Sequence, residues 1–249
     1  MGSLQQDVFI CLDCESTGLD IKSDRIIEIA AVRFTFDKVL ASRETLVNPE
    51  CPIPDESRAI HNISPEMVAS KPVIKLVLPE FLKMVEGHII VGHGIAFDIG
   101  LIAAEAERHG IPTKILQNQS IDTLRVARLY GESPINSLDR LRQHFNIEAQ
   151  GAHRAMSDVM VNIEVFKALT KGYKTTEELM TVLQKPIKLR AMPLGKHKGR
   201  KFNEIPIEYL LWAERKDFDQ DLLYSIRCEL RNRKKGGNYP SANSPFANL

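Results

Sequence analysis

Two acidic residues separated by one residue, Asp13 and Glu15, end an apolar segment that begins at Val8. On a β-strand, residues i and i+2 point to the same face, so this spacing brings two carboxylates together. Carboxylates held side by side repel each other, and a bound divalent cation relieves that repulsion. The pair alone is more typical of exposed acids at the end of a strand, so its assignment to a metal site depends on the rest of the chain.

Two later segments carry further candidates. Asp98 follows a short apolar stretch at a predicted helix start, where an acid also simply complements the helix dipole. His153 and Asp158 follow a glycine-containing loop. Five residues of helix turn through about 500°, so we expect His153 to lie in the loop before the helix, free to move over a site that Asp158 helps to build. A capping histidine and an ion-paired aspartate are the alternative.

Apolar patterns predict the elements that must position these residues. The continuous apolar run Val8–Leu12 is typical of a central strand covered on both faces. Asn48–Asn62, with three prolines, is expected to be a long loop. A helical segment over Val73–Val85 should break or kink at Pro79. Further strands are predicted at Ile26–Phe36, Ser42–Val47 and His88–Val91, and helices at Phe97–His109, Asp122–Tyr130, Ser137–Phe145 and Ala155–Thr170. This order favours an α/β fold with a mixed sheet.

The cysteines and the apolar runs indicate the cellular location of the protein. Cys11 and Cys14 have the C-x-x-C spacing of redox and zinc pairs, but residues three apart on a strand face opposite ways, so we favour two unpaired thiols. That pattern, and a start without signal-peptide character, predict a reducing, cytoplasmic location. No run approaches the roughly 18 apolar residues of a membrane span, so no membrane association is expected.

Charge is distributed unevenly along the chain. Residues 185–235 hold 14 basic and 7 acidic side chains, whereas residues 1–184 hold 19 basic and 25 acidic ones. An acidic body joined to a basic end suits a metal site combined with a polyanion-binding module, although a solvated basic surface gives the same count. Trp212 is predicted to lie in the core of that module. The expected phosphate contacts, clustered around two glycines, are Lys196, Lys198, Arg200 and Lys201.

The same features suggest four segments. Residues 1–174 are predicted to form an α/β domain, and residues 175–185 a linker helix. Residues 186–235 are predicted to form a small, basic, mainly helical accessory domain. Residues 236–249 are rich in Asn, Ser and Pro and are predicted to be disordered.

The order and local sequence of the acidic segments resemble the DEDDh branch of the DnaQ-like 3′→5′ exonucleases, the family of polymerase proofreading subunits and RNase T. The resemblance covers roughly residues 7–171. Asp13 and Glu15 match the first motif, Asp98 the second, and His153 with Asp158 the third, whose H-x(4)-D spacing is characteristic of the branch. The segments Arg25–Val32, Asp122–Leu124 and Asn136–Leu138 are also similar to the proofreading subunit.

This resemblance implies a ribonuclease H-like fold with a mixed five-stranded sheet flanked by helices. It implies hydrolysis of DNA or RNA from the 3′ end, releasing nucleoside 5′-monophosphates with two Mg²⁺ or Mn²⁺ ions. Asp13, Glu15, Asp98 and Asp158 would be the metal ligands, and neutral His153 would take the proton of the attacking water. The residues expected to contact the terminal nucleotide are Ser16, Thr17, Gly18, Leu19, His61 and Phe97.

Three departures from the family pattern bear on substrate preference: Ser16 replaces a second threonine, Gly94 replaces an asparagine, and Asn62 replaces a glycine. The expected partner is nucleic acid with a 3′ end, single-stranded by preference. A polymerase or other protein docked through Tyr209, Leu210 and Trp212, and a homodimer, are left open. A catalytically silent nucleic-acid-binding or polymerase-docking scaffold on the same fold is the alternative function, and the filled catalytic positions argue against it.

Overall fold

A computed structural model describes residues 3–130, 136–148 and 154–235 of the chain. The chain divides into two compact units, which we describe separately. The first unit comprises Met1–Val126 and Ser137–Leu183, and the second comprises Ala127–Asn136 and Gln184–Leu249. The second unit therefore includes a short segment, 127–136, that lies inside the α/β domain of the sequence-based division. Within the described residues, no helix has both the length and the hydrophobicity needed to cross a membrane.

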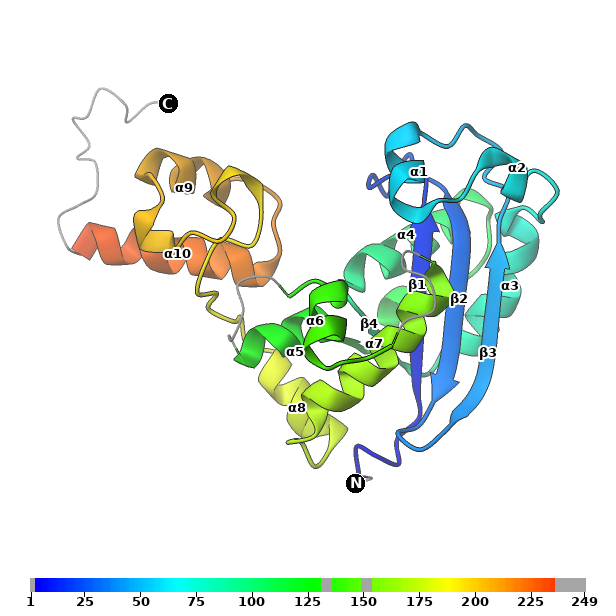
Figure 1. The fold of residues 1–249 in the computed structure, drawn as a ribbon, viewed down its shortest axis with the longest axis horizontal. Coiled ribbons are helices and arrows are strands. Elements are labelled where there is room, and N and C mark those ends of the chain that lie inside the picture. Colours follow the sequence, from blue (N-terminus) through cyan, green and yellow to red (C-terminus); the bar gives the residue numbers. More distant parts are fainter. Residues whose placement is uncertain (1–2, 131–135, 149–153, 236–249) are drawn as a thin grey trace. The chain divides into compact units, whose positions relative to one another are not determined.

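The first unit is built on a five-stranded sheet with the order β3-β2-β1-β4-β5. β1 is central because it pairs antiparallel with β2 and parallel with β4. The sheet is therefore mixed, as expected, and α/β in class (Figure 1). The strands are β1 Phe9–Ser16, β2 Ile26–Phe34, β3 Val39–Leu46, β4 Ile89–Gly92 and β5 Ser120–Asp122.

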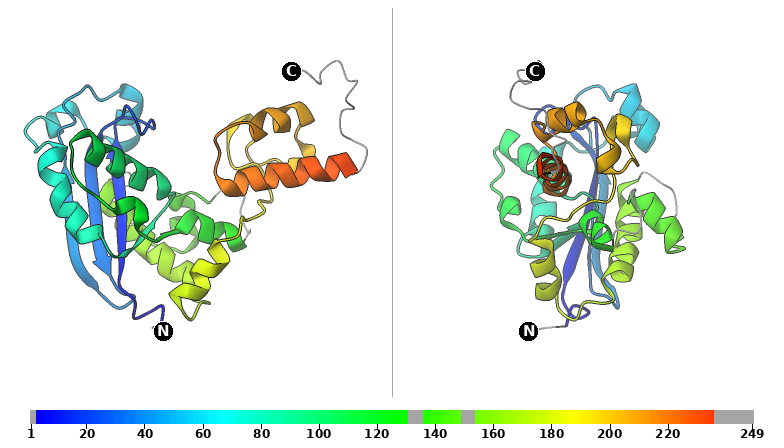
Figure 2. Two further views of the ribbon diagram at one scale, coloured as in Figure 1. Left: turned by 180° about the vertical axis from the view of Figure 1, so that it is seen from behind. Right: turned by 90° about the vertical axis from the view of Figure 1, so that its left-hand side faces the viewer.

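Side chains of β1 alternate between two helical layers. Phe9 packs its ring 5.2 Å from Phe166 of α7 (Ala155–Thr170), and the Cys11 thiol donates a hydrogen bond to the Val159 carbonyl of the same helix. The other set of β1 side chains, including Cys14, belongs to the core cluster formed with α3 and α4. The left view of Figure 2, seen from behind, shows those two helices in front of the sheet. Cys11 and Cys14 therefore face opposite ways, both are unpaired, and the C-x-x-C spacing makes no chelating pair.

The helices of the first unit differ from the sequence prediction at two places. The prolyl segment 48–62 is not all loop, because α1 occupies Asp55–His61. The helix predicted to break at Pro79 continues through it from Ile74 to Val85. The remaining helices are α2 Pro65–Val68, α4 Ala96–Arg108, α6 Leu138–His144 and α8 Thr176–Leu183. Helix α5, Thr123–Tyr130, begins in the first unit and continues into the second from Ala127 on.

The second unit has its own core, formed where α9 (Ile207–Glu214) packs on α10 (Gln220–Lys235). Arg128, almost fully buried, ties the end of α5 (Thr123–Tyr130) to this unit through hydrogen bonds to Asp219 and Asp221. A short loop turns back at 195–199, closed by an antiparallel bridge between Ala191 and Lys201. The buried core residues are Met192, Phe202, Ile205, Leu210, Ala213, Leu222, Ile226 and Leu230.

Candidate active site

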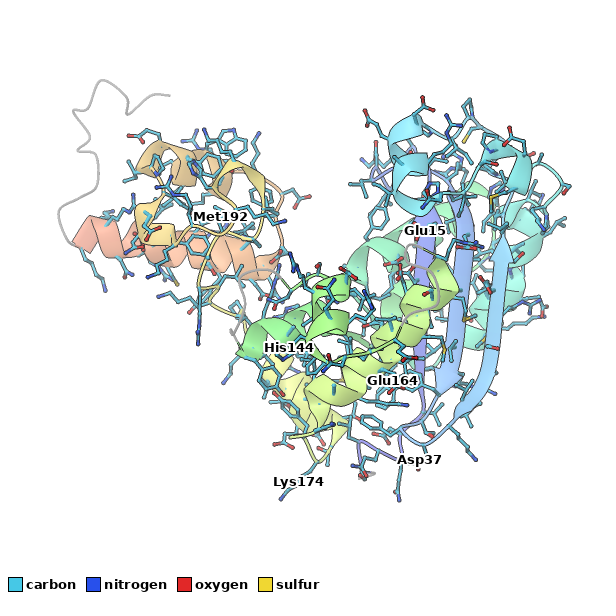
Figure 3. The ribbon with its side chains drawn as sticks, viewed as in Figure 1. Glu15, Asp37, His144, Glu164, Lys174 and Met192 are labelled. Carbon is cyan, nitrogen blue, oxygen red and sulfur yellow. The ribbon has the colours of Figure 1, made fainter. Side chains whose placement is uncertain are left out.

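Three predicted acids converge at one end of β1. Asp13 and Glu15 both lie on the face of β1 that packs against α7, and Asp158 lies in the first turns of α7. Each offers a carboxylate oxygen, and these atoms lie within 4.8 Å of one another. Figure 3 shows Glu15 at this end of the strand. Oxygen ligands gathered at this spacing suit a hard divalent cation such as Mg²⁺ or Mn²⁺.

Asp98 approaches the same strand end from the other helical layer. It occupies the first turn of α4 and is almost fully buried. Its Oδ1 accepts a hydrogen bond of 2.9 Å from the backbone amide of Cys14, the residue between Asp13 and Glu15. This bond fixes the Asp98 carboxylate beside the acidic pair, although Asp98 is not one of the three acids within 4.8 Å.

The pKa values of Asp13, Glu15 and Asp98 are all raised above their ordinary values. Burial, with the charges of Asp98, Glu15 and Asp158 next in importance, raises the pKa of Asp13 well above its ordinary value. Burial and the nearby Asp158 raise the pKa of Glu15 to about 8. Burial raises the pKa of Asp98 to about 7, against the opposing effect of the Cys14 hydrogen bond. A divalent cation would remove this conflict, so the donor set fits a metal ion.

Glu28 is a residue that the sequence analysis did not assign to the site. It lies on β2 directly opposite Glu15, fully buried, and it forms an ion pair of 2.6 Å with Arg154. The other carboxylate oxygen accepts a 2.9 Å hydrogen bond from the Ala155 amide, the first residue of α7. Glu28 thus anchors the start of the helix that carries Asp158. The sequence signal that could have identified Glu28 is its charge, since it lies inside the otherwise apolar run Ile26–Val32.

The turn after β1 is held by Asp24. The Thr17 hydroxyl donates a 2.8 Å hydrogen bond to the Asp24 carboxylate. Gly18 lies so close to this carboxylate that an added Cβ would come within 2.5 Å of it. The Ser16 hydroxyl donates to the Gly18 carbonyl at 2.7 Å, and Leu19 is left 87% exposed. The predicted substrate segment Ser16–Leu19 is therefore a fixed turn that projects one apolar side chain.

The other predicted substrate residues lie in different surroundings. Phe97, half-buried, packs against the core cluster at the start of α4. His61, at the end of α1, is buried, and its Nδ1 accepts a 3.0 Å hydrogen bond from the Ile63 amide. Burial lowers the pKa of His61, which favours the neutral ring. Its buried Nε2 has no hydrogen-bond partner among the described residues. His153 lies outside the described residues.

Comparison with known proteins identifies the family. A family model described as "Exonuclease" (RNase T) matches residues 10–166, well over half of the chain. The chain belongs to this exonuclease family. The match spans Asp13, Glu15, Asp98 and Asp158. A second model, described as "Putative quorum-sensing-regulated virulence factor", matches residues 180–225.

Relatives of the exonuclease domain include replication proteins. The chain is 33% identical over 165 residues to a DNA polymerase III subunit epsilon of Aquifex aeolicus, covering 66% of this chain and 81% of that one. It is 34% identical over 193 residues to a PolC-type DNA polymerase III of Caldanaerobacter subterraneus, covering 75% of this chain and only 14% of that one. Exonuclease X in complex with 5′-overhanging duplex DNA superimposes with a TM-score of 0.55 at 27% identity, over 71% of this chain and 99% of that one.

The raised carboxyl pKa values should make the stabilisation of the fold by a divalent metal depend on pH. A carboxyl whose folded pKa exceeds its unfolded pKa stabilises the fold fully below the unfolded value, and this contribution is lost as pH rises through the folded value. For Glu15 that window runs from 4.5 to about 8. We therefore expect the increase in Tm caused by Mg²⁺ or Mn²⁺, relative to EDTA, to grow between about pH 5 and pH 8.

Thermal unfolding at several pH values checks this expectation. A metal concentration about 100-fold above Kd contributes about 2.7 kcal/mol, which is readily seen as a shift in Tm. Glu15→Gln should reduce the pH dependence of the metal effect, because that group no longer exchanges a proton for the cation. An equal metal-induced shift at both ends of the pH range would contradict the assignment.

Proposed function

We propose that this chain is a metal-dependent 3′→5′ exonuclease that hydrolyses nucleic acid one nucleotide at a time and releases nucleoside 5′-monophosphates. The observation that carries the proposal is the convergence of Asp13, Glu15 and Asp158, from β1 and α7, with oxygens within 4.8 Å of one another. Membership of the exonuclease family supports the same activity.

In this proposal Asp13, Glu15, Asp98 and Asp158 hold two Mg²⁺ or Mn²⁺ ions. When bound, such ions supply a water of lowered pKa and neutralise charge on the scissile phosphate and the leaving oxygen. The protein contributes the orientation of its carboxylates. The Cys14 amide fixes Asp98, and Glu28 with Arg154 fixes the start of α7. His153, in its neutral form, would take the proton of the attacking water.

The terminal nucleotide would lie against the turn after β1. The backbone and side chains of Ser16, Thr17 and Gly18 would receive it, and the projecting Leu19 with Phe97 would pack against its base or sugar. The unpaired, buried Nε2 of His61 supports a hydrogen bond to the nucleotide, because a buried polar atom without a partner is costly.

We infer that DNA is the principal substrate, since the relatives in the comparison are DNA polymerase subunits and Exonuclease X is bound to DNA. Division of the chain into an exonuclease domain (1–174) and a basic accessory domain (186–235) is part of the same proposal. A polymerase partner, a homodimer and a cytoplasmic location stay predictions from the sequence.

A time course with 5′-end-labelled oligonucleotides tests the function. Single-stranded DNA, duplex DNA with a recessed 3′ end and single-stranded RNA are each incubated with Mg²⁺, Mn²⁺ or EDTA. The expected result is a ladder shortening by single nucleotides from the 3′ end, fastest on DNA and absent in EDTA. A chain that binds these strands and cuts none of them would instead be the catalytically silent scaffold.

A further inference from the structure

The second unit carries a pair of aromatic residues on α9, the exposed Trp212 and the half-buried Tyr209. Trp212 is 49% exposed, whereas its helix neighbours Leu210 and Ala213 are fully buried in the core. The Trp212 ring lies 5.2 Å from the ring of Tyr209, one turn earlier. The prediction that Trp212 belongs to the core was therefore wrong, and Leu210 is not available to a docked protein. A large aromatic side chain left outside a small core is a candidate contact surface.

Each ring of the pair is accompanied by a lysine. The ammonium of Lys196 lies 5.1 Å from the centroid of Tyr209, and that of Lys216 lies 5.0 Å from the centroid of Trp212. Both lysines are exposed, which limits what these contacts contribute to stability. Their positions place positive charge beside π-faces, the combination with which proteins bind single-stranded nucleic acid. We call Lys196, Tyr209, Trp212 and Lys216 the aromatic–cation surface.

The 192–200 loop fixes the Tyr209 side of this surface. Gly195 has φ +70° and sits so close to Tyr209 that a Cβ there would be 2.9 Å from the phenol oxygen. The His197 ring packs edge-on against Tyr209, with centroids 4.5 Å apart. Backbone hydrogen bonds between Met192 and Arg200, and between Gly199 and Met192, close the loop. A preorganised surface loses less conformational entropy when a ligand binds.

The surrounding charges favour a polyanion. Two more exposed cations, Lys198 and Arg200, follow Lys196 on the same loop, and the exposed Lys201 comes directly after it. Glu214 of α9 forms an ion pair with Arg227, which offsets its charge. The exposed Glu208, one turn before Trp212, marks a less favourable side for a phosphate backbone. A protein partner would need apolar surface, but the lysines at both rings interrupt it.

From these observations we infer that the aromatic–cation surface binds single-stranded polynucleotide. A base stacks on Trp212, and Lys196 and Lys216 contact the flanking phosphates. The strand continues along the cations of the 192–200 loop. This inference deepens the proposed function. The role of the surface, to retain the strand between successive cuts, rests on the proposed exonuclease activity. The binding itself is independent of catalysis and can be measured without it.

Trp212 is the one tryptophan of the chain, so its fluorescence reports on this surface alone. The full-length protein in EDTA is titrated with oligothymidylate and, separately, with oligouridylate of equal length. Stacking should quench the emission, and quenching should weaken as salt rises because phosphate contacts release counterions. The two strands distinguish DNA from RNA as the natural source. Tight binding of either strand with unchanged Trp212 emission would overturn the inference.

Variants separate this surface from nonspecific attraction, with binding followed by anisotropy of a labelled strand. Trp212→Ala should lower affinity by about tenfold, and Trp212→Phe should restore most of it because the ring still stacks. Replacing Lys196 and Lys216 together by Ala should reduce the salt slope by about two. Leu116→Ala, at a 72% exposed position in the first unit, is the matched control and should change nothing.

These experiments distinguish failure of the proposed binding surface from failure of the proposed exonuclease activity. Melting curves establish that each variant is folded. Quenching without hydrolysis by the wild-type protein in Mg²⁺ would refute the exonuclease proposal and support the surface. Hydrolysis together with wild-type affinity in Trp212→Ala would refute the surface. In that case an aromatic surface that binds a protein would be the better interpretation of α9.

Discussion

Replacement of Asp13 by alanine should reduce hydrolysis of an end-labelled single-stranded oligonucleotide by about 10³-fold or more in saturating Mg²⁺. Asp13 belongs to the cluster of three acids, and its pKa is raised by burial and by four neighbouring carboxylates, which include all the other predicted metal ligands. A loss of this size corresponds to about 4 kcal/mol of transition-state stabilisation. Single-turnover rates at saturating enzyme measure the effect on the chemical step.

A matched control and a stability measurement make this result specific. Asp37, exposed at the turn between β2 and β3, lies at the opposite end of the sheet from Glu15 (Figure 3), and Asp37→Ala should keep the wild-type rate. In EDTA, Asp13→Ala should unfold at a higher temperature than the wild type, because it removes one of several repelling carboxylates. Wild-type turnover by Asp13→Ala would exclude the acidic cluster from catalysis.

His153→Ala should reduce kcat at saturating substrate by about 10²-fold, the contribution typical of a positioned general base. Metal binding should survive, since the carboxylates are unchanged, so the Mg²⁺-induced increase in Tm should match that of the wild type. His144, exposed at the end of α6, provides the control variant His144→Ala. If His153→Ala also lost the Mg²⁺-induced increase in Tm, its slower reaction would be due to a disturbed metal site and not to the loss of a proton acceptor.

The continuous apolar run Val8–Leu12 predicted the central strand. The spacing of Asp13 and Glu15 predicted that both acids lie on one face of it. The sequence missed α1 because that helix buries only His61 and so has no apolar periodicity to detect. It predicted a break at Pro79 that does not occur. The helix buries Leu78, Phe81 and Leu82 around the proline, and this packing outweighs the hydrogen bond that proline cannot make.

Two features of the sites could not be deduced locally. Glu28 and Arg154 are separated by 126 positions, and only the folded sheet brings them together. Trp212 has the residue type and neighbours of a core position, but the small unit fills its core with Leu210 and Ala213 and leaves the larger ring outside. Local patterns identify which residues are apolar, whereas the amount of available interior decides which of them are buried.

The long separation between Glu28 and Arg154 has a consequence for biosynthesis. Strands β1 to β4 are complete once residue 92 has been made, but Arg154 and Asp158 arrive only with α7. At about 5–20 residues per second, a ribosome needs several more seconds to reach them. During that interval the nascent sheet carries Asp13, Glu15 and an unpaired Glu28 without the helix that completes the acidic cluster. We therefore expect the acidic cluster, and with it any hydrolytic activity, to be complete only after α7 has been synthesised and has packed on the sheet.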